Sequence, residues 1–349
     1  MRFSRVRKSA EIAFRNVRRR RRVMRSMPCR SQSIGNPSSP RGFTLIELLV
    51  VITIIAVLVG LLTAAAQATR QRMRELQIRN DISQLSTSVQ SWKTKHEMPY
   101  LPSRIVLRED GMYGTHATSA VATLEAQSIP VLKRIFPRLD TPQLAAARGN
   151  NPPFLGHDWN QDGVITAGDN GAFVLEGDQC LVFFLGGAQV NGATVGFSTN
   201  KAYPMSATGQ REPPVFEFPT SRLQFVAHPQ SATSPLFPNG APFLSFMDAN
   251  RDRPYLYFSA RQGNDYTSDC PSSQQWTGVG TPVIPYSEAT VARFINRDGF
   301  QIICAGADRT FGTGGTWDAA TGAPYVNNTN SPGRDDFANF HPLRLGAGQ

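Results

Sequence analysis

The sequence predicts an α+β fold in which one long N-terminal helix packs on an antiparallel β-sheet head with long loops. Three observations predict it. Residues 43–66 form an almost unbroken apolar run. Residues 67–97 are polar but carry apolar side chains at helical spacing, until prolines follow. From residue 98 to residue 349, short apolar segments alternate with glycine and proline, which is typical of strands joined by loops.

The N-terminal tail determines the net charge of the chain. Residues 1–41 hold 13 of the 36 Lys and Arg residues and one of the 26 acidic residues, a net charge of +12. The rest of the chain has 23 basic and 25 acidic residues, a net charge of −2. Charge in such a block belongs to a tail rather than to a domain. Without the tail the body has no excess positive charge to hold phosphates, so nucleic-acid binding is not favoured.

The apolar run of residues 43–66 is long enough to cross a bilayer, which needs about 20 residues. The basic tail should stay in the cytoplasm, which places the bulk of the chain on the other side of the membrane. The small residues Ala64 to Ala66 leave open an ordinary secretory signal cleaved after the run. Against that alternative stand a glycine and a phenylalanine at its start, Gly42 and Phe43, and a lone glutamate within it, Glu47.

The string RGFTLIELLVVITIIAVLVGLL at residues 41–62 resembles the N-terminal methylation motif of type IV pilins and type II secretion pseudopilins. The resemblance implies that a prepilin peptidase removes residues 1–42 as a leader by cutting after Gly42, and then N-methylates Phe43. It also implies that Glu47 takes part in assembly with other pilin or pseudopilin subunits. The protein would then sit in the inner membrane with its head in the periplasm.

The chemistry of Glu47 fits an assembly role. Placing a charged carboxylate within a bilayer costs at least a few kcal/mol. An ionisable residue in a membrane segment is therefore taken, by default, to have a function. Cleavage creates an α-ammonium group on Phe43. The Glu47 carboxylate of an incoming subunit could neutralise the Phe43 α-ammonium group of a neighbouring subunit, and this pairing would fix the axial register of the two subunits. A carboxylate that complements the helix dipole is an alternative reading, compatible with the first.

A 42-residue leader is longer than the short basic leaders common in that family. Met24 and Met27 offer internal starts, so the true start is open among Met1, Met24 and Met27.

The second half of the predicted helix carries one apolar stripe with steps of 4, 3, 4 and 3 residues: Ile78, Ile82, Leu85, Val89 and Trp92. We interpret the stripe as core packing against the head. A helix from Phe43 to about His96, stopped by Pro99, would have roughly 54 residues and a length of about 80 Å.

The head, residues 98–349, is expected to contain a short helix and several strands. The helix is placed at Ala120–Phe136. The strands are placed at Cys180–Leu185, Leu223–Ala227, Phe243–Met247, Tyr255–Ser259 and Phe300–Cys304.

One segment of the head has the pattern of a calcium loop and resembles the loops of EF-hands and dockerins. Gly163 supplies the sharp turn, and Ile165 is expected to pin the loop to the core. The expected ligands stand at positions 1, 3, 5, 7, 9 and 12 of the loop, the fourth through its carbonyl: Asp158, Asn160, Asp162, Val164, Thr166 and Asp169. An Asx-rich turn without metal remains the alternative.

The C-terminal stretch FQIICAGAD at residues 300–308, with a glycine-rich loop and a late acidic cluster after it, is similar to the end of major type II pseudopilins. That resemblance implies calcium ligands at Asp308, Asp335 and Asp336, with Asn339 as a further candidate. The function expected is a structural pseudopilin subunit with calcium as a structural cofactor. The alternative is a pilus-associated adhesin or minor pilin whose enlarged head binds a surface, DNA or cargo.

No catalytic signature supports an enzyme. The sequence has no HExxH, no GxSxG and no phosphate loop, since the GTGGT at Gly312–Thr316 lacks the Lys-Ser/Thr pair. A membrane-tethered hydrolase therefore has no supporting site. The body cysteines Cys180, Cys270 and Cys304 fit either one disulfide and a free thiol or three small buried hydrophobes.

Overall fold

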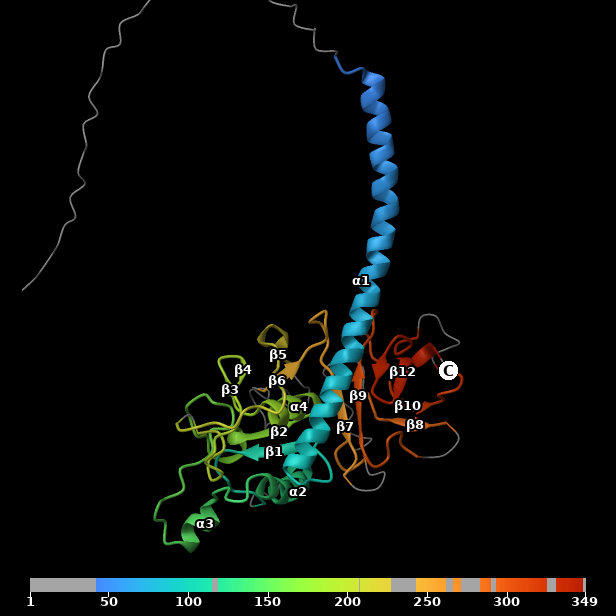
Figure 1. The fold of residues 1–349 in the computed structure, drawn as a ribbon. Coiled ribbons are helices and arrows are strands. Elements are labelled where there is room, and N and C mark those ends of the chain that lie inside the picture. The colour runs from blue at the N-terminus through green and yellow to red at the C-terminus, as the bar shows by residue number, and fades with distance from the viewer. Residues whose placement is uncertain are drawn as a thin grey trace, which may run out of the picture. The chain divides into compact units, whose positions relative to one another are not determined.

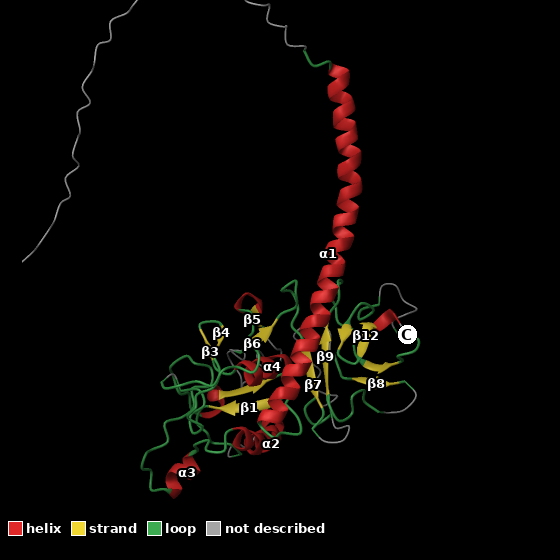
Figure 2. Cartoon of the chain, in the orientation of Figure 1, coloured by secondary structure: helices red, strands yellow, loops and turns green. Residues whose placement is uncertain are grey.

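The computed structural model describes residues 42–114, 119–206, 208–226, 243–261, 266–270, 283–289, 293–324 and 331–347. The fold is mixed α+β, as predicted (Figures 1 and 2). The chain divides into two compact units, Met1–Gly60 and Leu61–Gln349. Except for Gly42, the predicted leader lies outside the described residues.

Helix α1, Leu45–Lys95, begins in the first unit. Its large apolar side chains there are exposed on every side, from 45% at Val51 to 81% at Leu45. By length and composition α1 is the one described helix that could cross a membrane. An apolar surface of this extent requires a bilayer or other protein around it.

In the second unit α1 buries one face against the head. The predicted stripe from Ile78 to Trp92 is confirmed, and each of its five apolar residues is at most 5% exposed. The helix ends where predicted: Lys93 and Lys95 lie in its last turn, and the Met98 N–H donates to the Lys93 carbonyl at 3.0 Å. Glu97, two residues beyond the last residue of α1, has a positive φ of 51°, as is common just beyond a helix end.

The buried face of α1 also contains a charged residue, Asp81, which is 8% exposed. Its Oδ2 accepts hydrogen bonds from Arg222 at 2.7 Å and from the Tyr255 hydroxyl at 2.8 Å. Arg222 further donates to the Met247 carbonyl at 3.0 Å and lies over the Phe246 ring, 4.3 Å from its centroid. This group ties α1 to the head.

The strands form several small sheets rather than one. The largest is antiparallel, in the order β12 (His341–Arg344), β11 (Phe337–Ala338), β9 (Phe300–Cys304) and β7 (Leu256–Ser259). Three more pairs are antiparallel: β1 (Ile105–Arg108) with β2 (Ala172–Leu175), β3 (Gln189–Val190) with β4 (Ala193–Thr194), and β5 (Leu223–Phe225) with β6 (Leu244–Phe246). One pair is parallel, β8 (Tyr286–Glu288) with β10 (Gly315–Trp317). Four predicted strands correspond to β5, β6, β7 and β9.

Strand β9 separates two parts of the core. Ile302 and Cys304 pack in the main cluster with the stripe of α1, whereas Ile303 packs in a second cluster with Leu256 and Phe258 of β7. Successive side chains of a strand point to opposite faces. Both faces of β9 are therefore covered, which explains why four of its five residues are apolar; the fifth, Gln301, is buried with its amide bonded to the Tyr286 backbone.

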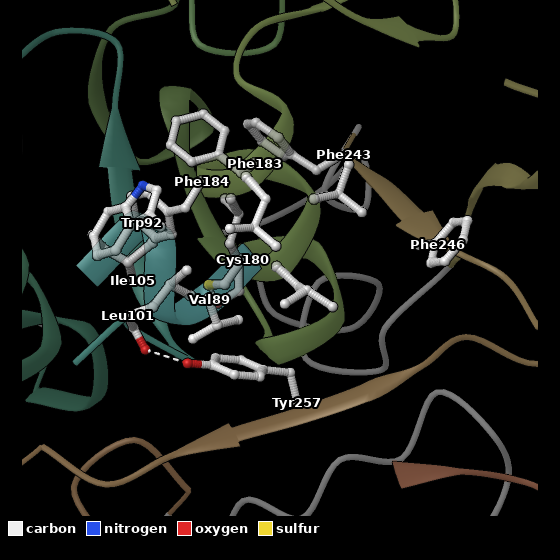
Figure 3. Packing of buried hydrophobic residues seen from close by; sticks show 14 of the residues in the cluster. Val89, Trp92, Leu101, Ile105, Cys180, Phe183, Phe184, Phe243, Phe246 and Tyr257 are labelled. Atoms are coloured by element: carbon white, nitrogen blue, oxygen red, sulfur yellow. Dashed lines mark hydrogen bonds between the residues drawn. The ribbon is translucent and has the colours of Figure 1, made fainter. Parts of the chain in front are cut away.

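The strand predicted at Cys180–Leu185 is wrong, because these residues lie in helix α4, Gly177–Gly186. All ten residues of α4 are buried, and Figure 3 shows Cys180, Phe183 and Phe184 packed with Val89 and Trp92 of α1. When a segment is apolar on all sides, its polar and apolar residues do not alternate with a period, so the pattern cannot distinguish a strand from a helix. Two missed signals favour a helix: Gln179 accepts the Glu176 backbone N–H at 3.3 Å in a capping box, and Gly187 follows with φ 82°.

The helix predicted at Ala120–Phe136 is confirmed as α2, Ser119–Ile135. A short helix that was not predicted, α3 (Pro142–Ala147), begins after Thr141, whose hydroxyl accepts the Leu144 N–H at 3.3 Å. Short 3-10 turns occur at η1 (Gly168–Gly171), η2 (Thr220–Arg222) and η3 (Leu345–Ala347).

The three body cysteines are free thiols. Cys180 and Cys304 are fully buried, and burial raises the pKa of both thiols well above the ordinary value. For these two residues the structure favours small buried hydrophobes over a disulfide.

Asp140, 3% exposed, holds the ends of α3 together. Arg148 donates to both of its carboxylate oxygens at 2.7 Å, and the Tyr203 hydroxyl donates at 2.5 Å. The Arg148 hydrogen bonds lower the pKa of Asp140 to about 2. Because the folded pKa lies below the unfolded one, the stabilisation is present above about pH 4 and is lost as the pH falls toward 2.

Asp140→Asn should therefore destabilise the full chain by about 2 kcal/mol at pH 6, and the difference from wild type should vanish near pH 2. The measurement is thermal unfolding of both chains in detergent across that pH range. Asp298→Asn, which removes an exposed ion pair with Arg297, is the control and should change stability little at any pH. A loss for Asp140→Asn that is equal at pH 6 and pH 2 would contradict this assignment.

Candidate functional site

The start of α1 is the first candidate site. Gly42 and Phe43 are exposed and precede the helix, so the bond between them is open to a peptidase. A Cβ added at Gly42 meets no atom within 4 Å. Nothing among the described residues therefore packs closely enough to require glycine at this position.

Glu47 is bonded to the end of its own helix. Thr44 and Glu47 form a capping box: the Glu47 N–H donates to the Thr44 hydroxyl at 3.2 Å, and the Thr44 N–H donates to Glu47 Oε2 at 2.9 Å. The Thr44 hydroxyl also donates to Oε2, at 2.8 Å. The carboxylate thus stabilises the start of the helix, as expected for a negative charge at the positive end of the helix dipole, and the Glu47 side chain is exposed.

The second candidate site is a group of three carboxylates in the head. Asp158 and Asp162, predicted from the calcium-loop pattern, meet Glu109, which follows strand β1. One oxygen from each residue lies within 4.8 Å of the others. Glu109 was not predicted, because a glutamate directly after an apolar strand carries no local sign of a partner in a distant loop.

The loop itself has the turn that its sequence predicts. Asp158 accepts the N–H groups of Asp162 at 3.1 Å and of Gly163 at 3.0 Å, and Gly163 has φ 83°. The Asn160 amide donates to Asp162 Oδ2 at 2.8 Å. This geometry is compatible both with a calcium-binding loop and with an Asx-rich turn that binds no metal.

The remaining loop residues are placed as follows. Val164 is 58% exposed, and Ile165 contacts Gly156 but stays 42% exposed, so it pins the loop less deeply than predicted. The Thr166 N–H donates to Glu109 Oε2 at 2.8 Å. Asp169 lies in η1, and its side chain is outside the described part of the structure.

Glu109 is fully buried, and its Oε1 has no hydrogen-bond partner. Burial raises the pKa of Glu109 to about 7, with further contributions from the nearby carboxylates of Asp162 and Asp158. A buried acceptor without a partner is rare and costs roughly 1–3 kcal/mol. The arrangement is one that a bound cation would relieve.

The C-terminal candidates are arranged differently. Asp335 Oδ2 accepts the N–H groups of Ala307 and Asp308, while Asp336 is fully buried and accepts the Gly312 N–H at 2.9 Å. Asp335 and Asp336 each have one buried oxygen without a partner. Among the described residues, Glu109, Asp158 and Asp162 are the only three His, Cys, Asp or Glu side chains whose potential ligand atoms all lie within 4.8 Å of one another.

Asn339 serves the fold of the C-terminal region. Its side chain accepts the Ile302 N–H at 3.0 Å and donates to the Phe300 carbonyl at 3.1 Å. Both groups of its amide are thereby used on strand β9.

The described histidines pack against aromatic rings. His96 lies 4.7 Å from the Trp92 ring, His157 5.1 Å from Trp159, and His341 5.0 Å from Trp317, measured between ring centroids. Desolvation lowers the pKa of all three, that of His96 to about 4. These contacts support a structural role for each ring.

Comparison with known proteins gives one match. The family model of the prokaryotic N-terminal methylation motif matches residues 38–63. No curated protein and no solved structure matches the chain. The matched segment contains Gly42, Phe43, the Thr44–Glu47 capping box and the first turns of α1. This chain therefore carries the prepilin-type signature of type IV pilins and pseudopilins.

Proposed function

We propose that this protein is a structural subunit of a pilin-like filament, and specifically a pseudopilin of a type II secretion system. The observation that carries the proposal is the exposed Gly42–Phe43 bond directly ahead of a capped, apolar helix with a glutamate in its first turn. A prepilin peptidase would cut this bond and methylate Phe43. The sequence of β9 and the residues after it favours the pseudopilin over other filament subunits.

The surface of α1 supports assembly. In the first unit the helix is apolar all round, and covering one Leu or Ile side chain there would contribute roughly 1.5–3 kcal/mol. Before assembly this segment would lie in the inner membrane, and afterwards it would pack among neighbouring subunits. With the leader carrying a net charge of +12, the N-terminus would face the cytoplasm before cleavage and the head would face the periplasm.

Mass spectrometry of the membrane fraction tests the processing step. The expected N-terminus is N-methyl-Phe43. Gly42→Val should leave the leader attached, because the proposed cleavage follows glycine and no close packing among the described residues requires one there. Gly35→Val, in the leader, is the matched control and should be processed normally. An unprocessed wild-type chain, or normal cleavage of Gly42→Val, would refute the proposal.

One observation favours a second function, binding of an anionic ligand or cargo by the head of an adhesin or minor pilin. A cavity of about 390 Å³ is lined by four arginines: Arg70, Arg74, Arg309 and Arg344. Two of them are already paired, Arg309 with Asp252 and Arg344 with Glu75, which reduces the free positive charge. Recovery of the chain in sheared surface pili rather than in the membrane fraction would favour this second function.

Calcium binding by the C-terminal carboxylates remains a prediction. Asp308 and Asp335 are adjacent, and burial together with the Asp335 carboxylate raises the pKa of Asp308. The unpartnered oxygens of Asp335 and Asp336 supply acceptors that a cation would use.

A further inference from the structure

We propose that Glu109, Asp158 and Asp162 form a Ca²⁺ site that fastens the loop of residues 156–171 to the end of strand β1. Glu109 is the ligand that the loop pattern does not contain. The inference does not rest on the proposed filament role, since a pilin-like subunit can assemble without such a site.

The first argument is that, within the described part of the chain, no cationic side chain neutralises the three carboxylates. None of them forms an ion pair with a described arginine, lysine or histidine. The nearest cationic residue in sequence, Arg108, directs its guanidinium to Asp110 and Glu125. Three carboxylates in one place repel each other, and burying one of them unpaired is costly.

The second argument does not depend on the clustering of acidic residues, because it concerns one buried oxygen of Glu109 that has no hydrogen-bond partner. Glu109 is fully buried, and one carboxylate oxygen receives the Thr166 N–H while the other receives nothing. That side chain reaches the oxygens of Asp158 and Asp162. A bound cation would supply the missing partner.

The third argument identifies the cation. All three side chains offer oxygen, which hard divalent cations prefer, whereas zinc prefers nitrogen and sulfur. Two oxygens on opposite sides of one Ca²⁺ are separated by at most about 5 Å, twice the usual bond length. The separations within 4.8 Å suit that geometry before any closure of the loop. Mg²⁺ requires a more rigid octahedral shell and is expected to bind more weakly.

The surrounding backbone already holds the parts together. The Glu109 N–H donates to the Gly171 carbonyl at 2.9 Å, and the His157 N–H donates to the Glu109 carbonyl at 2.8 Å. The Trp159 indole N–H donates to the Arg108 carbonyl at 2.9 Å. Both ends of the loop are thus fixed beside Glu109, so that little ordering is left for the cation to impose.

The test uses the full chain in detergent micelles, with Ca²⁺, with Mg²⁺ and with a chelator. Ca²⁺ should raise the melting temperature by about 5 °C or more at saturating concentration. Terbium provides a second readout, because Trp159 lies within the loop and should sensitise the luminescence of Tb³⁺ bound beside it. Ca²⁺ should displace that signal.

Glu109→Gln distinguishes a ligand from a merely structural residue. Glutamine keeps an acceptor for the Thr166 N–H and removes one of the three charges. In chelator the variant should melt at the same temperature as wild type or higher, while its Ca²⁺ affinity should fall by on the order of tenfold or more. Glu288→Gln, which alters a surface ion pair with Arg293, is the matched control and should bind like wild type.

Two outcomes would overturn the proposal. One is an absence of both the Ca²⁺ shift and the terbium signal in the wild-type chain. The other is an equal Ca²⁺ response in Glu109→Gln and wild type, which would leave a metal loop without Glu109. Neither outcome affects the expected N-methyl-Phe43, so failure of the site and failure of the filament role are separable.

Discussion

Glu47→Gln should yield a chain that loses its leader and enters the membrane but does not join filaments. The reason is that glutamine preserves the capping box while it removes the charge. A glutamine at this helix position can accept the same Thr44 N–H that Glu47 accepts at 2.9 Å. What glutamine cannot do is neutralise the α-ammonium group that cleavage creates on Phe43 of a neighbouring subunit.

Thr44→Ala is the matched control variant, because it weakens the helix cap and keeps the charge of Glu47. It removes the hydroxyl that accepts the Glu47 N–H at 3.2 Å, and it keeps the carboxylate. Loss of such a cap costs about 1 kcal/mol, which a long helix surrounded by apolar neighbours tolerates. This variant should still assemble.

The measurement is the fraction of mature chain recovered in sheared or cross-linked filaments, with N-terminal mass spectrometry to establish that each variant was processed. Incorporation of Glu47→Gln at the wild-type level would show that only the cap matters. Failure of Thr44→Ala together with normal assembly of Glu47→Gln would reverse the roles proposed for charge and cap.

Local sequence predicted those parts of the fold whose signal lies within a few residues. The stripe from Ile78 to Trp92 has helical spacing and is buried as predicted. Strand β9 was predicted at its observed bounds, because four apolar residues and one glutamine form a short run between turn residues. The capping box at Thr44 was also readable in the sequence, although only Glu47 was singled out.

Prediction failed where tertiary contacts decide. The residues of α4 are apolar on all sides, so strand and helix could be told apart only by the capping pattern at Glu176 and Gln179. Glu109 could not be identified as a candidate ligand from its own neighbours in the sequence, because its partners Asp158 and Asp162 lie in a distant loop. The division of the strands into small sheets depends on pairings between segments far apart in the chain, which no local pattern specifies.

Asp81 is a further residue that local pattern could not explain, and its replacement should have the largest effect on the stability of the head. Asp81→Ala is expected to lower the free energy of unfolding by about 3–5 kcal/mol, because Arg222 would remain buried without its partner. The Arg222 guanidinium is 2.7 Å from Asp81 and is held in place by the Met247 carbonyl. This contact and the Phe246 ring beneath the guanidinium would keep it against the head once Asp81 is removed.

Another ion pair between α1 and the head provides the matched control. Glu75 pairs with Arg344, and the two side chains are 24% and 35% exposed, against about a tenth for each of Asp81 and Arg222. Since exposed pairs contribute roughly 0–1 kcal/mol, Glu75→Ala should change stability little. The measurement is denaturant unfolding of the full chain in detergent, followed by the intrinsic fluorescence of its four tryptophans, of which Trp92 is buried between α1 and the head.

A second substitution separates the cost of the unpaired charge from the loss of the contact itself. Adding Arg222→Met to Asp81→Ala removes the stranded cation and leaves an apolar side chain over the Phe246 ring. The double variant should therefore be more stable than Asp81→Ala alone, because a buried pair replaced on both sides often costs little. If Asp81→Ala and Glu75→Ala proved equally mild, the apolar stripe alone would hold α1 to the head. If the double variant were the less stable one, Arg222 would stabilise the fold through its contacts with Met247 and Phe246, and the cost assigned to a stranded cation would be wrong.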